Sequence, residues 1–145
     1  MKSQRFGIEI EMTGLTRRSA ALIIAKHFDT GIKHERGIYD TYSVCDQDGR
    51  KWKIVRDASI TPQCGNRFNY DPDYKVEVVS PICHYDDIET IQSIVRELRR
   101  NGHAKVNESC GIHIHVDASK HTARSLRNIA NIMYSKEDLI FKALK

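Results

Sequence analysis

The pattern of apolar and polar positions predicts six strands. Apolar side chains alternate with polar ones, as in a strand with one buried face, over residues 6–12, 74–80 and 111–117. Shorter runs that also favour strands occur at residues 42–46, 51–56 and 104–107. Asp48-Gly49, between two of these runs, favours a hairpin turn. Pro81 lacks the N–H that a strand donates and ends the strand before it. We expect loops at residues 29–40 and 57–73.

A period near 3.6 residues predicts four helices. They cover residues 17–28, 86–100, 123–134 and 136–144. Thr16 is a suitable N-cap for the first helix. Asp86 with Glu89 forms an aspartate version of the capping box for the second, and Ser135 is the expected cap of the last. We therefore predict an α+β fold, with a largely antiparallel sheet and helices packed on one face. The other face is then free to form the floor of a site.

Length and charge are those of an ordinary globular domain. The chain has 145 residues, of which 40% are hydrophobic and 29% charged, a composition that supports one folded domain. Its net charge of +4 comes from scattered Lys and Arg, not from a dense basic stripe. No apolar run is long enough to cross a membrane, and the four cysteines form no CxxC pair. We expect a cytoplasmic domain with reduced thiols that binds neither nucleic acid nor membrane.

Acidic and imidazole side chains occupy the polar faces of three predicted strands. In GIEIE, Glu9 and Glu11 lie on one face, ~6.7 Å apart along the strand. His113 and His115 have the same spacing in GIHIHV, and Glu77 lies between valines in YKVEVV. Each residue alone fits an ordinary solvated strand. Their combination is unusual, because aligned carboxylates repel each other and favour a nearby cation.

This set of ligands predicts a divalent cation. If the three strands share one sheet, its polar face carries three carboxylates and two imidazoles. Hard oxygen ligands with neutral imidazole suit Mg²⁺ or Mn²⁺ better than zinc. Several carboxylates can hold more than one such ion, and these ions can bridge phosphate groups.

Four segments in order resemble the putative amidoligase family, which is similar to the glutamate–cysteine ligase and glutamine synthetase superfamily of carboxylate–amine ligases. They are GIEIE at residues 7–11, DASI at 57–60, VEVVSP at 76–81 and CGIHIHVD at 110–117. The arginines and further acidic ligands that these relatives carry in their later half have no match after His115. Residues 1–145 therefore resemble the N-terminal part of an amidoligase-like catalytic domain, and we expect a longer native chain.

The resemblance implies a glutamine-synthetase-like sheet that binds ATP together with Mg²⁺ or Mn²⁺ on its concave face. The implied metal ligands are Glu9, Glu11, Glu77 and His113. Three of them, Glu11, Glu77 and His113, also contribute to nucleotide binding through the metal. The implied catalytic residues, near substrate or phosphate, are Asp57, Ser59 and His115. The implied reaction joins a carboxylate, which we expect to be glutamate-like, to an amine through an acyl phosphate, and an oligomer is compatible with it.

Other functions stay open on the residues alone. A structural zinc module would combine Cys110, His113 and His115 with Cys83 or His84. A catalytically inactive amidoligase-like fragment would keep the fold without the reaction. A nucleic-acid or protein interaction surface would use several exposed side chains, namely Arg17, Arg18, Arg96, Arg99, Arg100, Tyr39 and Tyr42.

Overall fold

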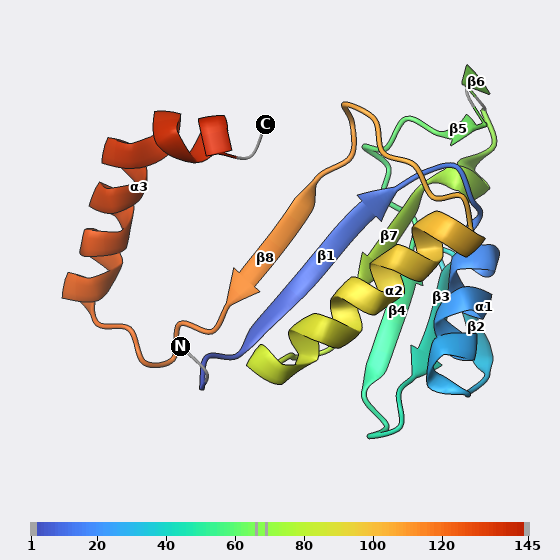
Figure 1. The fold of residues 1–145 in the computed structure, drawn as a ribbon, viewed down its shortest axis with the longest axis horizontal. Coiled ribbons are helices and arrows are strands. Elements are labelled where there is room, and N and C mark those ends of the chain that lie inside the picture. Colours follow the sequence, from blue (N-terminus) through green and yellow to red (C-terminus); the bar gives the residue numbers. More distant parts are fainter. Residues whose placement is uncertain (1–2, 66, 69, 144–145) are drawn as a thin grey trace.

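An antiparallel sheet forms the centre of the computed structural model, which describes residues 3–65, 67–68 and 70–143 (Figure 1). Within these residues the sheet has six strands in the order β2-β3-β4-β7-β1-β8. Their bounds are β1 Phe6–Met12, β2 Ile32–Arg36, β3 Thr41–Cys45, β4 Lys51–Val55, β7 Val76–Val79 and β8 Ile112–Val116. The α+β fold with a largely antiparallel sheet is confirmed.

The shorter elements lie in the segment that connects β4 to α2. They are β5 Gln63–Cys64 and β6 Arg67–Phe68, which pair with each other, and the 3₁₀ turns η1 Pro72–Tyr74 and η2 Tyr85–Asp87. The expected loop at residues 57–73 thus contains a small hairpin. The predicted end of a strand at Pro81 agrees with β7, which ends at Val79.

Two strand predictions were wrong. Residues 29–40 were expected to be a loop, but they contain β2, an edge strand that pairs with β3. Its side chains are mostly exposed, so no apolar alternation marks it. Residues 104–107 were expected to be a strand, but Lys105 forms only an isolated bridge with Thr13. The chain there meets Thr13, the residue after β1, and leaves the sheet again.

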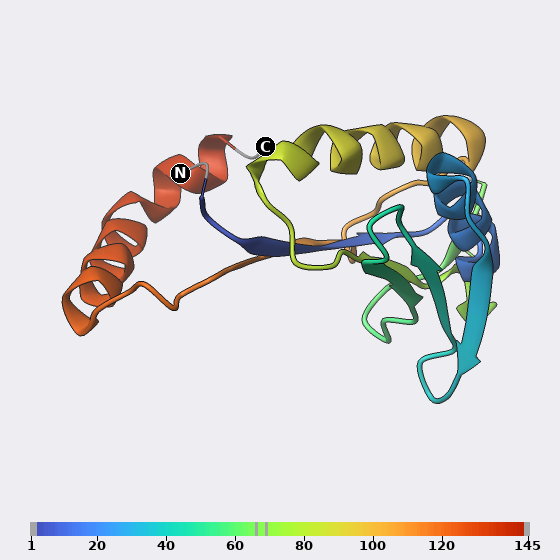
Figure 2. The ribbon, with the colours of Figure 1, turned by 90° about the horizontal axis from the view of Figure 1, so that it is seen from below.

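Two helices cover one face of the sheet, whereas a third lies beside its β8 edge (Figures 1 and 2). The helices are α1 Arg17–Phe28, α2 Ile88–Asn101 and α3 Ala123–Ala143. The hydroxyl of Thr16 accepts a hydrogen bond from the Ser19 N–H and caps α1 as predicted. Helices on one face were therefore correctly predicted for α1 and α2 but not for α3.

Two helix boundaries differ from the prediction. Asp86 does not cap α2, because it lies in the 3₁₀ turn that precedes this helix. The carboxylate of Asp87 accepts a hydrogen bond from the His84 N–H, and this bond closes the 3₁₀ turn before α2. Residues 123–134 and 136–144 were expected to be separate helices, but α3 is continuous to Ala143, and Lys145 and its neighbour lie outside the described residues. The Ser135 hydroxyl bonds to the Ile132 carbonyl inside α3, so it caps nothing.

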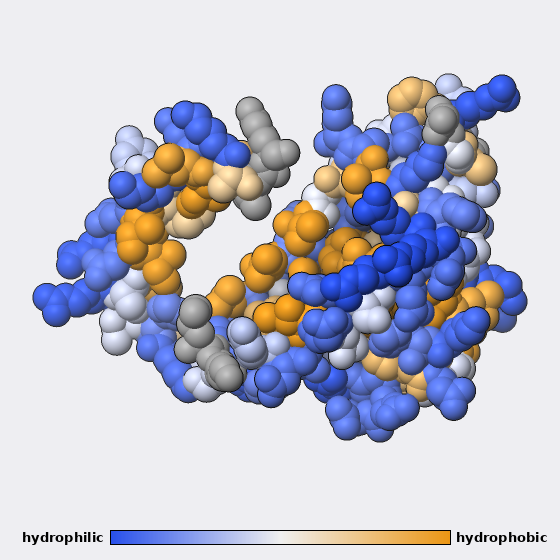
Figure 3. All heavy atoms as spheres, in the orientation of Figure 1, coloured by the Kyte–Doolittle hydropathy of each residue, from blue (hydrophilic) through white to orange (hydrophobic). Residues whose placement is uncertain are grey.

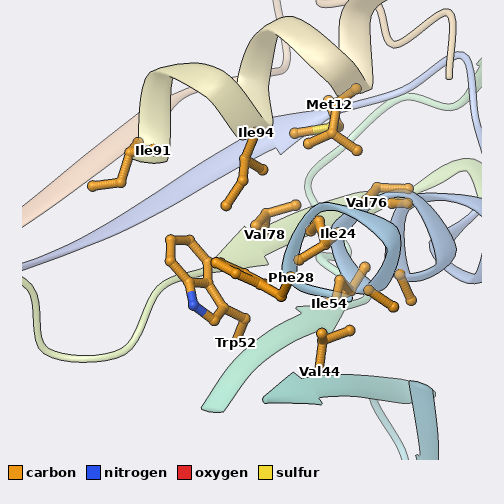
Figure 4. Packing of buried hydrophobic residues seen from close by; sticks show 14 of the residues in the cluster. Met12, Ile24, Phe28, Val44, Trp52, Ile54, Val76, Val78, Ile91 and Ile94 are labelled. Carbon is orange, nitrogen blue, oxygen red and sulfur yellow. The ribbon is translucent and has the colours of Figure 1, made fainter. Parts of the chain in front are cut away.

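The hydrophobic core lies between α1, α2 and the strands beneath them (Figure 4). Trp52 of β4 packs against Phe28 of α1, with ring centroids 5.6 Å apart. Ile94 of α2 and Met12 of β1 are also buried here. Each such side chain stabilises the fold by ~1.5–3 kcal/mol relative to an exposed position. Because Met12 points toward the helices, alternation directs Glu9 and Glu11 toward the other face of the sheet.

The helical layer ends at α2 and leaves the β8 edge uncovered. Ile112, Ile114 and Val116 of β8 are more than half exposed. Helix α3 contains no buried side chain among its described residues. On the face shown in Figure 3, apolar residues gather over both β8 and α3. The core that orders the sheet therefore lies on the α1 and α2 side.

Candidate functional site

The three strands that carry the predicted site lie side by side. β1 pairs with β7 on one side and with β8 on the other. This register places Glu11 opposite Glu77 and Glu9 opposite His113. All of these side chains project from the face of the sheet that α1 and α2 leave free. The sheet therefore gathers residues that are up to about a hundred positions apart in the chain.

Glu9 is bracketed by the two histidines of β8. Nδ1 of His113 lies 3.1 Å from Oε2 of Glu9, and Nε2 of His115 lies 3.2 Å from Oε1. Both imidazoles are exposed, whereas Glu9 is half-buried. One carboxylate thus orients two potential ligand rings on an accessible surface.

Glu11 is the most deeply placed acid of the site. Only 5% of its surface is exposed. Its Oε2 accepts a hydrogen bond of 2.6 Å from the Gly111 N–H, just before β8 begins. This bond fixes the carboxylate and leaves further lone pairs directed to its neighbours.

Two groups of three side chains come within reach of a common cation. Ligand atoms of Glu9, Glu77 and His113 all lie within 4.8 Å of one another, and so do those of Glu11, Asp57 and Glu77. Glu77 belongs to both groups and lies between them. The arrangement could hold one or two divalent ions in adjacent positions.

Asp57 enters this cluster from the loop that follows β4. Its Oδ1 accepts hydrogen bonds from the N–H and the hydroxyl of Ser59, each at 2.6 Å. These bonds, the Ser59 hydroxyl first, hold the pKa of Asp57 below its usual range despite partial burial. Asp57 is therefore ionised and could act as a ligand, and Ser59 contacts the cluster through it.

The close approach of these acids perturbs their protonation. Burial, together with the charges of Glu9, Asp57 and Glu11, raises the pKa of Glu77 to about 7. Partial burial raises the pKa of Glu9, but hydrogen bonding to His115 and His113 outweighs it and lowers that pKa overall. The hydrogen bond to Glu9 raises the pKa of His113. The site thus has an excess of negative charge at its centre that a cation would neutralise.

The chemistry of the donors fits a hard divalent ion. Four carboxylates and one imidazole are the ligands that Mg²⁺ and Mn²⁺ accept. Among the described residues, no group of three potential ligands within this reach contains a cysteine. The predicted zinc alternative therefore finds no support, because Cys83 is buried and Cys110 contacts Asn107.

Sequence reasoning anticipated most of these positions. The structure brings together all four predicted metal ligands, Glu9, Glu11, Glu77 and His113. His115 contacts Glu9 but belongs to neither group of three. The sequence indicated Asp57 near the substrate but did not place it with the predicted metal ligands, and it did not indicate the N–H of Gly111 as a partner of Glu11. The short Asp-x-Ser turn is the signal that could have directed attention to Asp57.

One alternative function loses a key residue. Arg17 was a candidate for a nucleic-acid surface, but only 2% of it is exposed. It forms ion pairs with Asp40 and Asp73. It also donates hydrogen bonds to the Pro72 and Lys75 carbonyls, so its guanidinium is occupied by contacts within the fold.

Within the described part of the chain, no helix is both long and apolar enough to span a membrane.

Fold and site together define a class of protein in which an antiparallel sheet presents carboxylates and histidine on its open face. Comparison with protein families makes this specific, since residues 2–145 match the family described as "Putative amidoligase enzyme". The chain belongs to this amidoligase family, and its function is of the ligase type. Neither the curated proteins nor the solved structures compared with it gave a match.

Proposed function

We propose that this protein is an ATP-dependent carboxylate–amine ligase that requires Mg²⁺ or Mn²⁺. The observation that carries the proposal is the cluster of Glu9, Glu11, Asp57, Glu77 and His113 on the open face of the sheet. Family membership supports the ligase class. The raised pKa of Glu77 supports a requirement for a cation, because uncompensated acids in such proximity resist ionisation.

The proposed reaction transfers the γ-phosphoryl group of ATP to a carboxylate and releases ADP. An amine nitrogen then attacks the resulting acyl phosphate, loses a proton, and displaces phosphate to leave an amide. Bound divalent ions would neutralise charge on the phosphate oxygens during the transfer. No protein nucleophile is needed for this sequence of bonds.

The residues of the site have two proposed roles, which are to hold the divalent ions and to contact the substrate or phosphate. Glu9, Glu11, Glu77 and His113 would hold the ions, and the structure adds Asp57 to this set. Ser59 keeps Asp57 ionised and oriented. We assign His115, exposed on the same face and held by Glu9, to contact with substrate or phosphate. We propose a glutamate-like carboxylate as the substrate and the cytoplasm as the compartment.

Calorimetric titration of Mg·ADP tests the proposal. We expect magnesium-dependent binding to the wild-type chain and its loss in the double variant Glu9→Gln/Glu11→Gln. The control is Glu35→Gln, which removes a glutamate of the same sheet whose partners are Lys51 and Ser43. It should bind as the wild type does.

Three results would contradict the proposal. Equal binding by the wild type and the double variant would place the nucleotide elsewhere. The absence of binding in all three folded proteins would argue against an ATP-dependent reaction. Binding without ATP turnover, over a panel of amino-acid carboxylates and amines, would favour the catalytically inactive alternative.

A further inference from the structure

We propose that Asn107 and Ser109 are positioning residues that hold Asp57 within the cation cluster. They lie in the loop that precedes β8, and within the described part of the chain their side-chain hydrogen bonds involve Thr61, Cys110 and each other, not a carboxylate of the cluster. The inference rests on the proposed function, because it concerns the cation that this function requires. Its basis is a set of hydrogen bonds that joins two loops far apart in the sequence.

The two residues bind both polar backbone groups of Thr61. The Ser109 hydroxyl accepts a hydrogen bond of 2.8 Å from the Thr61 N–H, and Nδ2 of Asn107 donates one of 2.9 Å to the Thr61 carbonyl. The Ser109 hydroxyl also donates to Oδ1 of Asn107 at 2.6 Å. We call these three residues the clasp. Each member of the clasp thus orients the others.

The clasp connects the loop of Asp57 to β8. Asp57 lies four positions before Thr61, and the intervening Ile60 is fully buried. On the other side of the clasp, Gly111 follows Ser109 by two residues and binds Glu11 through its N–H. His113 comes two residues later, in β8. One short segment therefore links the loop of Asp57 to Glu11 and His113, which the pairing of β1 with β8 already holds together.

Asp57 needs such a link because it lies outside regular structure. β4 ends at Val55, and the sheet ladder holds Glu9, Glu11, Glu77 and His113 but not Asp57. The Ser59 bonds orient the carboxylate within its own turn, and Lys75 holds the Ala58 carbonyl. Neither bond ties this turn to β1 or β8. The clasp connects the loop to the segment before β8 at Thr61, and the Thr13 hydroxyl after β1 binds the same loop two residues further on, at Gln63. Thr61 is the nearer of these two anchors to Asp57, and ligand groups must be held within ~0.5 Å for productive geometry.

The test is Mn²⁺ binding followed by electron paramagnetic resonance, which counts free and bound ions without any reaction. We expect Ser109→Ala and Asn107→Ala to bind Mn²⁺ roughly 10–100-fold more weakly, as is typical when a group that orients a metal ligand is removed. Ser109→Thr retains the hydroxyl and should restore near wild-type affinity. The two alanine variants remove different bonds of the clasp, so either one can serve if the other fails to fold.

A matched control separates positioning from general stability. Ser119 makes the same kind of turn with Asp117 beyond the other end of β8, with its N–H and hydroxyl both bound to that carboxylate. Ser119→Ala should therefore leave the Mn²⁺ affinity unchanged. Because the clasp acts through Asp57, combining Ser109→Ala with Asp57→Asn should weaken binding no further than Asp57→Asn alone.

Two outcomes would overturn the inference. Wild-type Mn²⁺ affinity in folded Ser109→Ala and Asn107→Ala would show that the clasp only closes a surface loop. Additive losses in the double variant would show that it does not act through Asp57. If the wild type itself binds no Mn²⁺, the proposed function fails together with the inference, and the blank wild-type titration distinguishes this case from the first two.

Discussion

Glu77 is the acid of the site whose protonation the neighbouring carboxylates affect most. It is shared by both groups of potential ligands, and burial together with three neighbouring carboxylates raises its pKa to about 7. An acid whose pKa is raised on folding opposes folding once it ionises. The metal-free protein therefore stores an unfavourable interaction that a bound cation would relieve.

We predict that Glu77→Gln stabilises the metal-free protein at pH 8. The folded-state pKa lies above the unfolded value, so the penalty is absent below pH 4.5 and complete above about pH 7. Removing the charge should raise the melting temperature at pH 8 by about 2–4 °C, equivalent to ~1 kcal/mol. The variant should gain little at pH 5. Thermal unfolding followed by circular dichroism, in chelator, measures this effect.

When Mg²⁺ or Mn²⁺ is added, the order of the melting temperatures should reverse, so that the wild type melts above Glu77→Gln. The wild type gains stability from the ion and the variant gains less, because one shared ligand is lost. Glu35→Gln serves again as the control. Lys51 lowers the pKa of Glu35, so its loss should not stabilise the fold. A metal-free Glu77→Gln that melts below the wild type at pH 8 would show that Glu77 is not under repulsion.

At the scale of elements, α3 differs from the other two helices. α1 and α2 each bury apolar residues against the sheet, whereas no described residue of α3 is buried. Its apolar side chains are exposed, and they include Leu126, Ile129, Met133 and Phe141. Helices in proteins take most of their stability from the packing of an apolar face.

We therefore predict that α3 is the least protected helix. In hydrogen exchange measured by mass spectrometry on the dilute protein, amides of α3 should exchange at least tenfold faster than those of α2. α2 is the internal control, because it is of comparable amphipathic character but packs on the core. Equal protection of α2 and α3 would mean that the apolar side chains of α3 are covered in solution.

Local signals were sufficient for some elements and not for others. β1, α1 and the hairpin of β3 and β4 follow from alternation, a capping threonine and Asp48-Gly49, all of which act within a few residues. β2 could not be predicted, because an exposed edge strand is held by backbone bonds to β3 that leave no apolar pattern. α3 continues through Ser135, whose hydroxyl binds the Ile132 carbonyl inside the helix and does not cap a new one.

At the scale of the whole molecule, cation binding should depend on pH. Glu77 and His113 have raised pKa values, and both must lose a proton before they can act as ligands. Glu77 is mostly protonated at pH 6 and mostly ionised at pH 8. Its protonation alone should therefore make the Mn²⁺ affinity about 10-fold weaker at pH 6 than at pH 8. Calorimetry at the two pH values measures the affinities.

The variant Glu77→Gln provides the control for this pH dependence. It should bind Mn²⁺ more weakly than the wild type, and its affinity should change less between pH 6 and pH 8. Proton release on binding can be counted by repeating the titration in buffers of different ionisation enthalpy. An affinity that is the same at both pH values in the wild type would contradict the protonation of Glu77.

The face on which each strand residue lies could be read from the chain, because side chains alternate with a period of two whatever the strand pairs with. That rule is enough to place Glu9 with Glu11, and His113 with His115, and to predict a hard cation as their ligand. The order β7-β1-β8 required the fold, since hydrogen bonds between distant strands set it. The position of Asp57 also required the fold, because its loop has no period. Buried Ile60 and the bonds of Thr61 and Gln63 to distant segments hold this loop in place.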